Sequence, residues 1–341
     1  MFKRIMSFGS GCCLLLAIPL LSACSDSSDS SGVSKSWSSL GITESHDLQS
    51  VRAIGSKIYA GGLAKNGCVS LRIFENNVQT AHLNVSGTLG VNWGIYDDPD
   101  GNIYLGWTGP YQANQGHVSK YDPSTGAITD TGLTGAESVD DVYWFDGKCY
   151  AAGVDSNGSG RVWRYDGSTW TSTGDGWLCT VDTLISFKDT LYIAGGNGGT
   201  CLAEICDYQL NTWIPVTHLD NNASVIWAFT ADSSALYAGG YAPDLSGKVW
   251  KYDGNGWRDL NIQNCDVINA LRVSSDGILY AGGVDSNGNG QVWMYGKYDN
   301  TWTSTGLTDS VTVHDFTEAR NGAIYAVGVD SDRNGQMWKY E

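Results

Sequence analysis

The sequence predicts an all-β protein in which seven blades of four strands each close into one ring. The main observation is a repeated unit in which a hydrophobic residue and a Tyr are followed by small residues and Gly, as at residues 58–62 and 279–283. The tyrosines of the seven units are spaced 42 to 46 residues apart, at Tyr59, Tyr104, Tyr150, Tyr192, Tyr237, Tyr280 and Tyr325. A repeat of this length accommodates one blade of four short strands, so the fold expected is a seven-bladed β-propeller.

Each unit divides into four strands. The first precedes the tyrosine, as at residues 139–145, and it turns into the second through dipeptides such as Asp146-Gly147, which favour the positive φ angles of a tight hairpin. The third strand carries a Trp before a final Tyr, as at residues 162–165, and the short fourth strand opens with a Trp, as at Trp170. The same four-strand pattern recurs around the predicted ring.

The two ends of the chain supply one blade together. The sequence stops at Glu341, directly after a third strand, so the last unit lacks its fourth strand. Residues 36–41 (Ser-Trp-Ser-Ser-Leu-Gly) match the fourth-strand segment 301–307 in type and rhythm. Because an open edge strand is a liability, we expect this N-terminal strand to complete the last blade of a propeller that spans residues 37–341.

The repeats resemble kelch repeats. Both have a hydrophobic strand that ends in Gly-Gly, then a Tyr with an acidic turn and a Trp five to seven residues later, as from Tyr165 to Trp170. The sequence departs from the kelch pattern by adding a Trp to the third strand, at Trp163, Trp250, Trp293 and Trp338. The resemblance implies protein binding, as in most kelch-like propellers, or enzymatic action on sugars or alcohols, as in a minority of them.

The N-terminus resembles that of a bacterial lipoprotein. Lys3 and Arg4 precede an apolar run, residues 14–21, that is too short to cross a bilayer. The run ends in Leu21-Ser22-Ala23-Cys24, which resembles a lipobox. The resemblance implies that residues 1–23 are a signal peptide removed before Cys24, and that lipid on Cys24 anchors the chain in the membrane.

Residues 24–36 are expected to be a disordered tether behind the lipidated cysteine. Nearly all of them are Ser, Asp or Gly, so the segment has nothing to bury. Ser25 directly after the cysteine resembles an outer-membrane sorting signal of Gram-negative lipoproteins. The sequence therefore predicts a lipid-anchored protein of the bacterial cell envelope, in the outer membrane if the cell is Gram-negative.

The charge of the chain argues against nucleic acid as a partner. The formal net charge is −16, and no cluster of basic residues offsets it. Phosphate backbones require such clusters, whereas cationic ligands suit an acidic body.

The predicted binding site is the mouth of the central channel, where the first strands begin. A sugar or a basic peptide side chain suits the carboxylates, amides and Trp faces expected there. The candidate residues are Gln49, Trp93, Asp140, Asp141, Asp182, Trp227, Asn269, His314 and Asp315. The alternative is that these residues bond the first strand of the neighbouring blade.

Three loops between second and third strands share the spacing of calcium loops. Each has oxygen-bearing side chains at positions 1, 3 and 5 and Gly at position 6, which allows a sharp turn around a hard cation. The candidate ligands are Asp155, Asn157 and Ser159, then Asp285, Asn287 and Asn289, then Asp330, Asp332 and Asn334. The alternative is a polar hairpin loop. Structural calcium is the one cofactor that the sequence suggests, and none is required.

These observations favour a non-catalytic scaffold that binds a protein or glycan of the envelope. The alternative is a kelch-like envelope enzyme acting on sugars, an epimerase or a glycosidase. Nothing in the sequence marks two acids as a catalytic pair. Arg52, Arg272 and Arg320 lie in or near first strands, but at different distances from their tyrosines, which weakens the case for convergence. Two acids, or an Arg and an acid, in one pocket would favour the enzyme.

Overall fold

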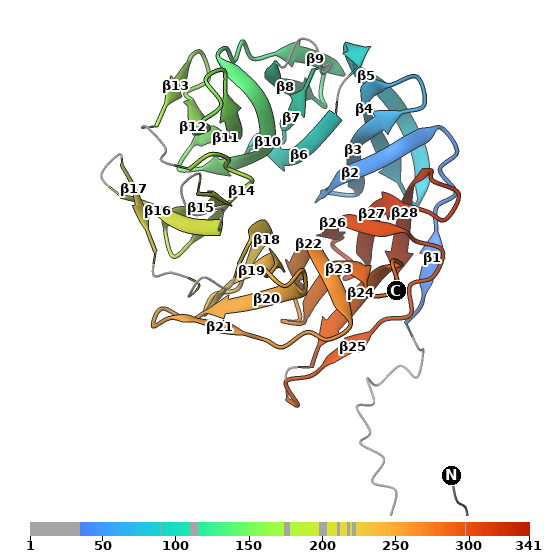
Figure 1. Ribbon diagram of the computed structural model, residues 1–341. Helices are drawn as coiled ribbons and strands as arrows, with labels where there is room; N and C mark the ends of the chain where they lie inside the picture. Colours follow the sequence, from blue (N-terminus) through green and yellow to red (C-terminus); the bar gives the residue numbers. More distant parts are fainter. Residues whose placement is uncertain are drawn as a thin grey trace, which may run out of the picture. The chain divides into compact units, whose positions relative to one another are not determined.

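Seven antiparallel sheets surround one central axis in the computed structural model (Figure 1). The structure describes residues 35–341 except 90, 110–114, 174–177, 198–202, 210–211, 217–218, 220–222 and 297. Each sheet has four strands in the order first, second, third, fourth, with the first strand nearest the axis. The predicted seven-bladed β-propeller of four-stranded blades is therefore confirmed. Within the described ranges, no helix is long and apolar enough to span a bilayer.

The strands follow the chain from blade to blade. Blade 1 contains β2 (Ser45–Ile54), β3 (Lys57–Ala64), β4 (Cys68–Glu75) and β5 (Val78–Leu89). Blade 2 contains β6 (Val91–Asp97), β7 (Ile103–Thr108), β8 (Gly116–Asp122) and β9 (Ala127–Asp130). Blade 3 contains β10 (Ala136–Phe145), β11 (Lys148–Asp155), β12 (Gly160–Tyr165) and β13 (Trp170–Ser172). Blade 4 contains β14 (Thr183–Phe187), β15 (Thr190–Gly196), β16 (Ala203–Gln209) and β17 (Thr212–Pro215).

The remaining blades repeat the pattern. Blade 5 contains β18 (Val225–Ala231), β19 (Leu236–Tyr241), β20 (Gly247–Tyr252) and β21 (Trp257–Asp259). Blade 6 contains β22 (Cys265–Val273), β23 (Leu279–Asp285), β24 (Gly290–Tyr295) and β25 (Trp302–Ser304). Blade 7 combines β26 (Thr312–Glu318), β27 (Ile324–Val329) and β28 (Gly335–Tyr340) with β1 (Trp37–Ser39) from the other end of the chain.

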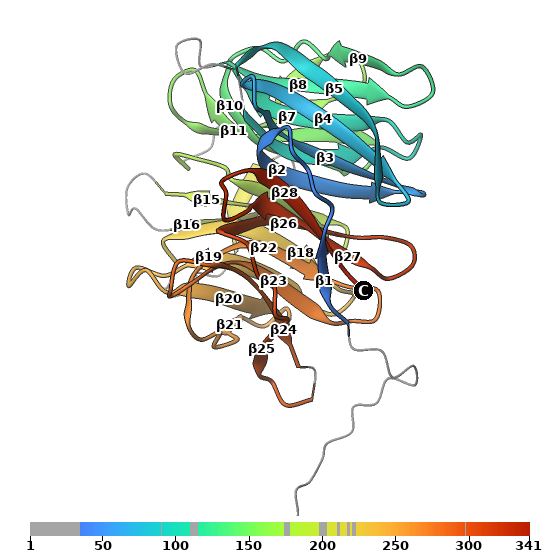
Figure 2. The same cartoon turned by 90° about the vertical axis from the view of Figure 1, so that its right-hand side faces the viewer.

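The N-terminal strand closes the ring as predicted. β1 runs antiparallel to β28 (Figure 2), with Trp37 opposite Tyr340. The rings of these two residues stack with centroids 4.9 Å apart. Trp37 also reaches the preceding blade, where its Nε1 donates to Thr305 Oγ1 at 2.9 Å. The same kind of bond joins fourth strands elsewhere, from Trp170 to Thr131 and from Trp213 to Thr173. Trp37, Trp170 and Trp213 therefore each bond the neighbouring blade.

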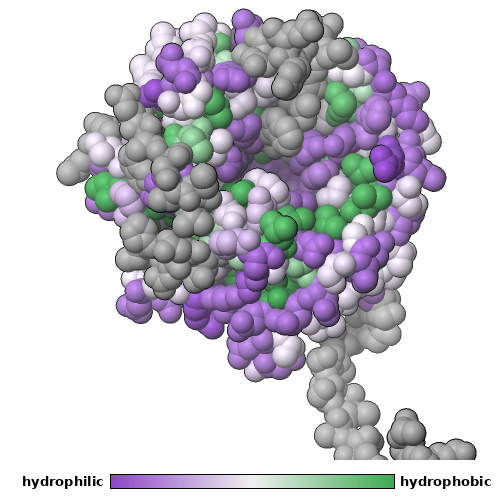
Figure 3. All heavy atoms as spheres, viewed as in Figure 1, coloured by the Kyte–Doolittle hydropathy of each residue, from purple (hydrophilic) through white to green (hydrophobic). Residues whose placement is uncertain are grey.

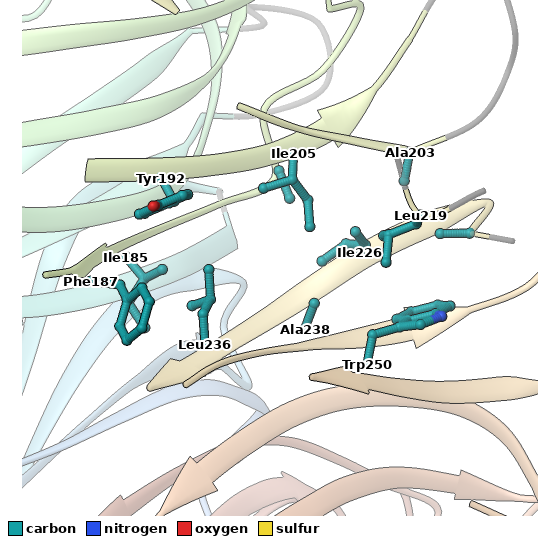
Figure 4. Close-up of a cluster of buried hydrophobic side chains, with 12 residues drawn as sticks. Ile185, Phe187, Tyr192, Ala203, Ile205, Leu219, Ile226, Leu236, Ala238 and Trp250 are labelled. Carbon is teal, nitrogen blue, oxygen red and sulfur yellow. The ribbon is translucent and has the colours of Figure 1, made fainter. Parts of the chain in front are cut away.

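The hydrophobic core lies between the blades. Figure 4 shows the cluster between blades 4 and 5, where Ile185 and Ile205 face Ile226, Leu236 and Trp250. These five side chains are at most 9% exposed. Their burial stabilises the contact between sheets through the hydrophobic effect, so each blade depends on its neighbours.

Candidate functional site at the channel mouth

In six of the seven blades, a β-bulge turns one residue of the first strand out of the ladder. In blade 3, Val139 pairs with Gly153 and Asp141 with Ala152, which leaves Asp140 between them without a partner strand residue. An extra residue of this kind changes the direction in which its side chain points. The residue skipped in the register is the same one in six blades: Gln49, Trp93, Asp140, Trp227, Asn269 and His314. Asp182 directly precedes β14 in the fourth blade.

In five blades a glycine of the second strand makes room for the bulge. Gly283 pairs with Ile268, and a methyl group on Gly283 would overlap the carbonyl oxygen of Val267. Gly allows the two backbones to approach this closely. The same overlap with the first strand of its own blade would occur at Gly62, Gly153, Gly240 and Gly328, whereas blade 2 has Trp107 at this position. The glycines that mark the repeat in the sequence therefore also help to place the side chains of the channel mouth.

Six of these side chains border one cavity. Its volume is about 460 Å³, and it is lined by Gln49, Asp140, Asp182, Trp227, Asn269 and His314. Figure 3 shows a hollow at the centre of the ring, bordered largely by hydrophilic residues. The indole of Trp227 is 42% exposed there, which is unusual for so large an aromatic residue. The structure thus brings together the residues that the sequence proposed, apart from three considered next.

Asp141 and Asp315 serve the contact between blades. The Oδ2 atom of Asp141 accepts the backbone N–H of Leu184 in blade 4 at 2.8 Å. Asp315 likewise accepts the N–H of Val51 in blade 1 at 2.8 Å. For these two residues the structure supports the alternative that the sequence left open, because both carboxylates bond a neighbouring first strand. Trp93 belongs to β6, but its side chain lies outside the described part of the structure.

Asn269 has both roles. It lines the cavity, and its Nδ2 donates to the carbonyl oxygen of Val313 at 3.0 Å and to Thr312 Oγ1 at 3.1 Å. Blade 7 therefore holds the whole side-chain amide of Asn269 in place, including its carbonyl oxygen.

The two acids of the mouth hold protons more tightly than exposed acids do. Burial raises the pKa of Asp140 to about 7, and the negative charge of Asp182 adds to this shift. Burial alone raises the pKa of Asp182 to about 6. Asp140 receives a hydrogen bond from Ser138 Oγ at 3.1 Å, which only partly compensates. A bound cation would stabilise the ionised pair.

A second ring of side chains lies three residues further along the first strands. It includes Arg52, Tyr96, Tyr143, Ile185, Thr230 and Arg272, which line a cavity of about 350 Å³ together with the residues of the mouth. Arg52 pairs with Tyr59, and Arg272 pairs with Tyr280, so the two arginines occupy equivalent positions. Their different distances from their tyrosines along the chain come from connecting hairpins of different length. Arg320 lies on an exposed turn.

The three candidate calcium loops are hairpins held by their first aspartate. Asp155 Oδ1 accepts the N–H groups of Asn157 and Ser159, at 2.9 and 3.1 Å. Its Oδ2 pairs with Arg161 at 2.6 Å. Equivalent backbone bonds reach Asp285 from Asn287 and Asn289, and Asp330 from Asn334.

The Gly at position 6 of these loops is explained by the close approach of another segment of the chain. A methyl group on Gly290 would overlap Ser310, and one on Gly335 would overlap Ser45 and the backbone of Asp47, in each case at the start of the next first strand. In the part of the chain that is described, no three His, Cys, Asp or Glu residues gather as metal ligands. Hydrogen bonds and sterics thus account for the loop sequence, and calcium binding stays a prediction.

Calcium is expected to have little effect on stability. Because each first aspartate already accepts backbone N–H groups, we expect 2 mM CaCl₂ to change the melting temperature by less than about 1 °C relative to EDTA. Differential scanning calorimetry of the purified chain tests this, with MgCl₂ as the control. A calcium-specific rise that saturates would instead establish bound ions in the loops.

Comparisons with known proteins show a likeness in fold. No protein-family model and no curated protein matches the chain. The WD40 β-propeller domain of Doa1 matches 89% of this chain over 95% of its own length, with a TM-score of 0.66 and 14% identity. The computationally designed Ika8 protein matches 85% of the chain over 83% of its own length, with a TM-score of 0.55 and 18% identity. At such identities the likeness concerns architecture. The chain is thus a seven-bladed β-propeller that resembles WD40 propellers.

Proposed function

We propose that this chain is a non-catalytic scaffold that recruits a protein or glycan of the bacterial envelope at the mouth of its channel. The observation that carries the proposal is the cavity of about 460 Å³, to which six blades each contribute one side chain. Acid, amide, imidazole and indole groups converge there on fixed strands. Such a mixture of apolar surface and few placed polar groups is typical of binding sites.

The chemistry of the mouth favours a ligand with a cationic or hydroxyl-rich group. Asp140 and Asp182 attract positive charge, and the exposed face of Trp227 can stack on a sugar ring or contact a cation. The net charge of −16 favours the same partners and disfavours nucleic acid. A Lys or Arg side chain of a protein partner, or a sugar unit of a glycan, fits this description.

The lipid anchor and the location are proposed on the sequence around Cys24. Residues 1–34 lie outside the described part, and the compact unit starts at Lys35. Lipid on Cys24 and a tether over residues 24–36 would place the propeller at a membrane surface. In a Gram-negative cell, Ser25 favours the outer membrane.

One observation favours an enzyme acting on sugars as the second candidate. Asp140 and Asp182 line one cavity, and their pKa values are raised to about 7 and about 6. Near pH 6.5 the first would be mostly protonated and the second mostly ionised, as an acid and a base or nucleophile require. A glycosidase or an epimerase could use such a pair.

Loss of Trp227 is expected to abolish recruitment. The purified chain, immobilised and exposed to detergent-solubilised envelope, should retain a single protein or saccharide. Trp227→Ala should reduce that retention by about tenfold or more, since a central aromatic contact contributes about 2 kcal/mol. Tyr298→Ala is the matched control, because Tyr298 is 96% exposed and lies outside the mouth.

The same chain separates the scaffold from the enzyme. Envelope oligosaccharides incubated with it should keep their reducing-end content and their sugar composition. Turnover that disappears in Asp140→Asn would establish the enzyme and reject the scaffold. Equal retention by Trp227→Ala and by the unchanged chain would show that binding occurs elsewhere.

A further inference from the structure

The interior of the channel contains an arginine that forms no direct ion pair with a described residue. Arg272 of blade 6 lies in the ring below the mouth, and its Nε atom is buried without a hydrogen-bond partner among the described residues. A buried donor left without an acceptor is destabilising, and more so when it is charged. Burial and the positive charge of Arg52 both lower the pKa of Arg272. The side chain is thus in an environment that disfavours its own charge.

The two carboxylates that attract Arg272, those of Asp315 and Glu318, already accept other hydrogen bonds. Asp315 accepts the backbone N–H groups of Val51 and Phe316. Glu318 accepts the N–H of Ser275 at 2.8 Å and its hydroxyl at 2.6 Å. These acids attract Arg272 through space, but neither forms an ion pair with it among the described residues.

Arg52, by contrast, has an ion-pair partner that fixes its position. Its Nε donates to Asp97 Oδ1 at 2.7 Å, and its guanidinium lies 3.8 Å from the centre of the Tyr96 ring. The Tyr96 ring in turn contacts Tyr143, with centroids 4.3 Å apart. The Arg52 and Asp97 side chains are each 27% exposed, so the ring of residues remains open to solvent along the channel. Arg52 therefore offers a second, fixed guanidinium in the cavity that Arg272 also lines.

We propose that Arg272 and Arg52 bind the carboxylate of a small acidic ligand, the size of a sugar acid, inside the channel. An anion between the two guanidiniums would supply the missing acceptor for Arg272 and relieve the repulsion between the two charges. The cavity of about 350 Å³ is within the range of natural small-molecule sites, and Tyr96 and Tyr143 give it an aromatic wall. The two arginines lie three residues further along the first strands than the residues of the mouth, which border the same cavity.

The balance of charge selects a single negative charge. Asp97 pairs with Arg52, and the same cavity is also lined by Asp140, Asp141, Asp182 and Asp315, so at most the one positive charge of Arg272 is left for a ligand. The planar guanidinium fork matches the two oxygens of a carboxylate. A dianion would bring a second negative charge close to Asp315 and Glu318, so phosphate should bind more weakly than a carboxylate.

Calorimetric titration of the purified full chain tests the proposal. Three probes separate the chemistry: galacturonate carries a carboxylate, galactose has a similar ring without the charge, and inorganic phosphate is a different oxyanion. Galacturonate should bind at least tenfold more tightly than galactose or phosphate. Arg272→Gln should weaken galacturonate binding at least tenfold, and Arg272→Lys, which keeps the charge and loses the fork, should weaken it less.

Arg258→Gln is the matched control, because it removes the same charge from an exposed position of β21 and should leave galacturonate binding unchanged. Melting temperatures of all variants verify folding, and Arg272→Gln should not be less stable than the unchanged chain, since it removes an unmatched buried charge. Equal affinity for galacturonate and galactose, tighter binding of phosphate, or full binding by Arg272→Gln would each overturn the proposal. The recruitment test with Trp227→Ala is scored separately, so failure of one site leaves the other standing.

Discussion

A chain that begins at Ile42 is expected to melt about 10 °C or more below the unchanged protein. Without β1, blade 7 retains three strands and exposes the edge of β28. The backbone bonds from Ser36 to Glu341 and from Leu40 to Met337 are lost, as is the bond from Trp37 to Thr305. At about 1 kcal/mol for each hydrogen bond, together with the stacked Trp37 ring, the loss is about 4–5 kcal/mol. In a ring this loss also weakens the contact between blades 6 and 7.

The matched control is a chain that begins at Lys35, which keeps β1 and removes only what precedes it. We expect its melting temperature to stay within about 1 °C of that of the unchanged protein, because the deleted residues lie outside the compact unit. Trp37→Ala should fall between the two truncations. If the chains that begin at Lys35 and at Ile42 melt together, the ring does not depend on its N-terminal strand.

The blades could be predicted from the sequence because each blade packs in the same way with the same residue types. Tyr and small residues recur on the second strand, and a Trp recurs on the fourth, so the period could be counted directly. Trp37 could be assigned to blade 7 because it reproduces the fourth-strand pattern, and its bond to Thr305 repeats the bond from Trp170 to Thr131. Each repeat therefore serves as independent evidence for the strand pattern of a blade.

The candidate site was only partly predictable, because a bulge interrupts the alternation of a strand. Asp140 and Asp141 are neighbours of the same type, yet one lines the mouth and the other bonds Leu184 of the next blade. Sequence alternation alone cannot decide which of two adjacent residues is the extra one. The glycines opposite the bulge were a usable signal, since a methyl group on Gly153 would overlap the first strand beside that point.

The position of the arginine pair is hidden in the sequence for a different reason. The number of residues from Arg52 or Arg272 to the next tyrosine includes the turn between the strands, and the two turns differ in length. Each arginine nevertheless lies opposite the tyrosine of its own blade in the register. In the calcium loops, one pattern suits both a cation loop and a hairpin, and the structure shows why Gly recurs there, because a methyl group on Gly290 would overlap Ser310 and one on Gly335 would overlap Ser45.

Raising the pH from 5 to 8 is expected to lower the melting temperature by roughly 5 °C. Burial raises the pKa values of Asp140 and Asp141 to about 7, and those of Asp182 and Asp315 to about 6, from the ordinary value of 3.8. Between pH 4 and pH 7 the folded chain therefore binds more protons than the unfolded chain. The free energy of unfolding must then decrease as the pH rises through this window, by an amount on the order of a few kcal/mol.

Asp140→Asn tests the origin of this dependence. The amide keeps the shape of the side chain but carries no charge, so the variant should be more stable than the unchanged protein at pH 8 and similar to it at pH 5. Asp100→Asn removes a charge from an exposed turn and keeps the residue preference of that turn, so it should leave the pH profile unchanged. Melting curves across the pH range measure all three proteins. A profile that is flat, or that Asp140→Asn does not flatten, would show that the acids of the mouth are solvated. In that case the mouth would bind a cation more weakly than proposed here, because solvated carboxylates gain little from a bound ammonium or guanidinium group.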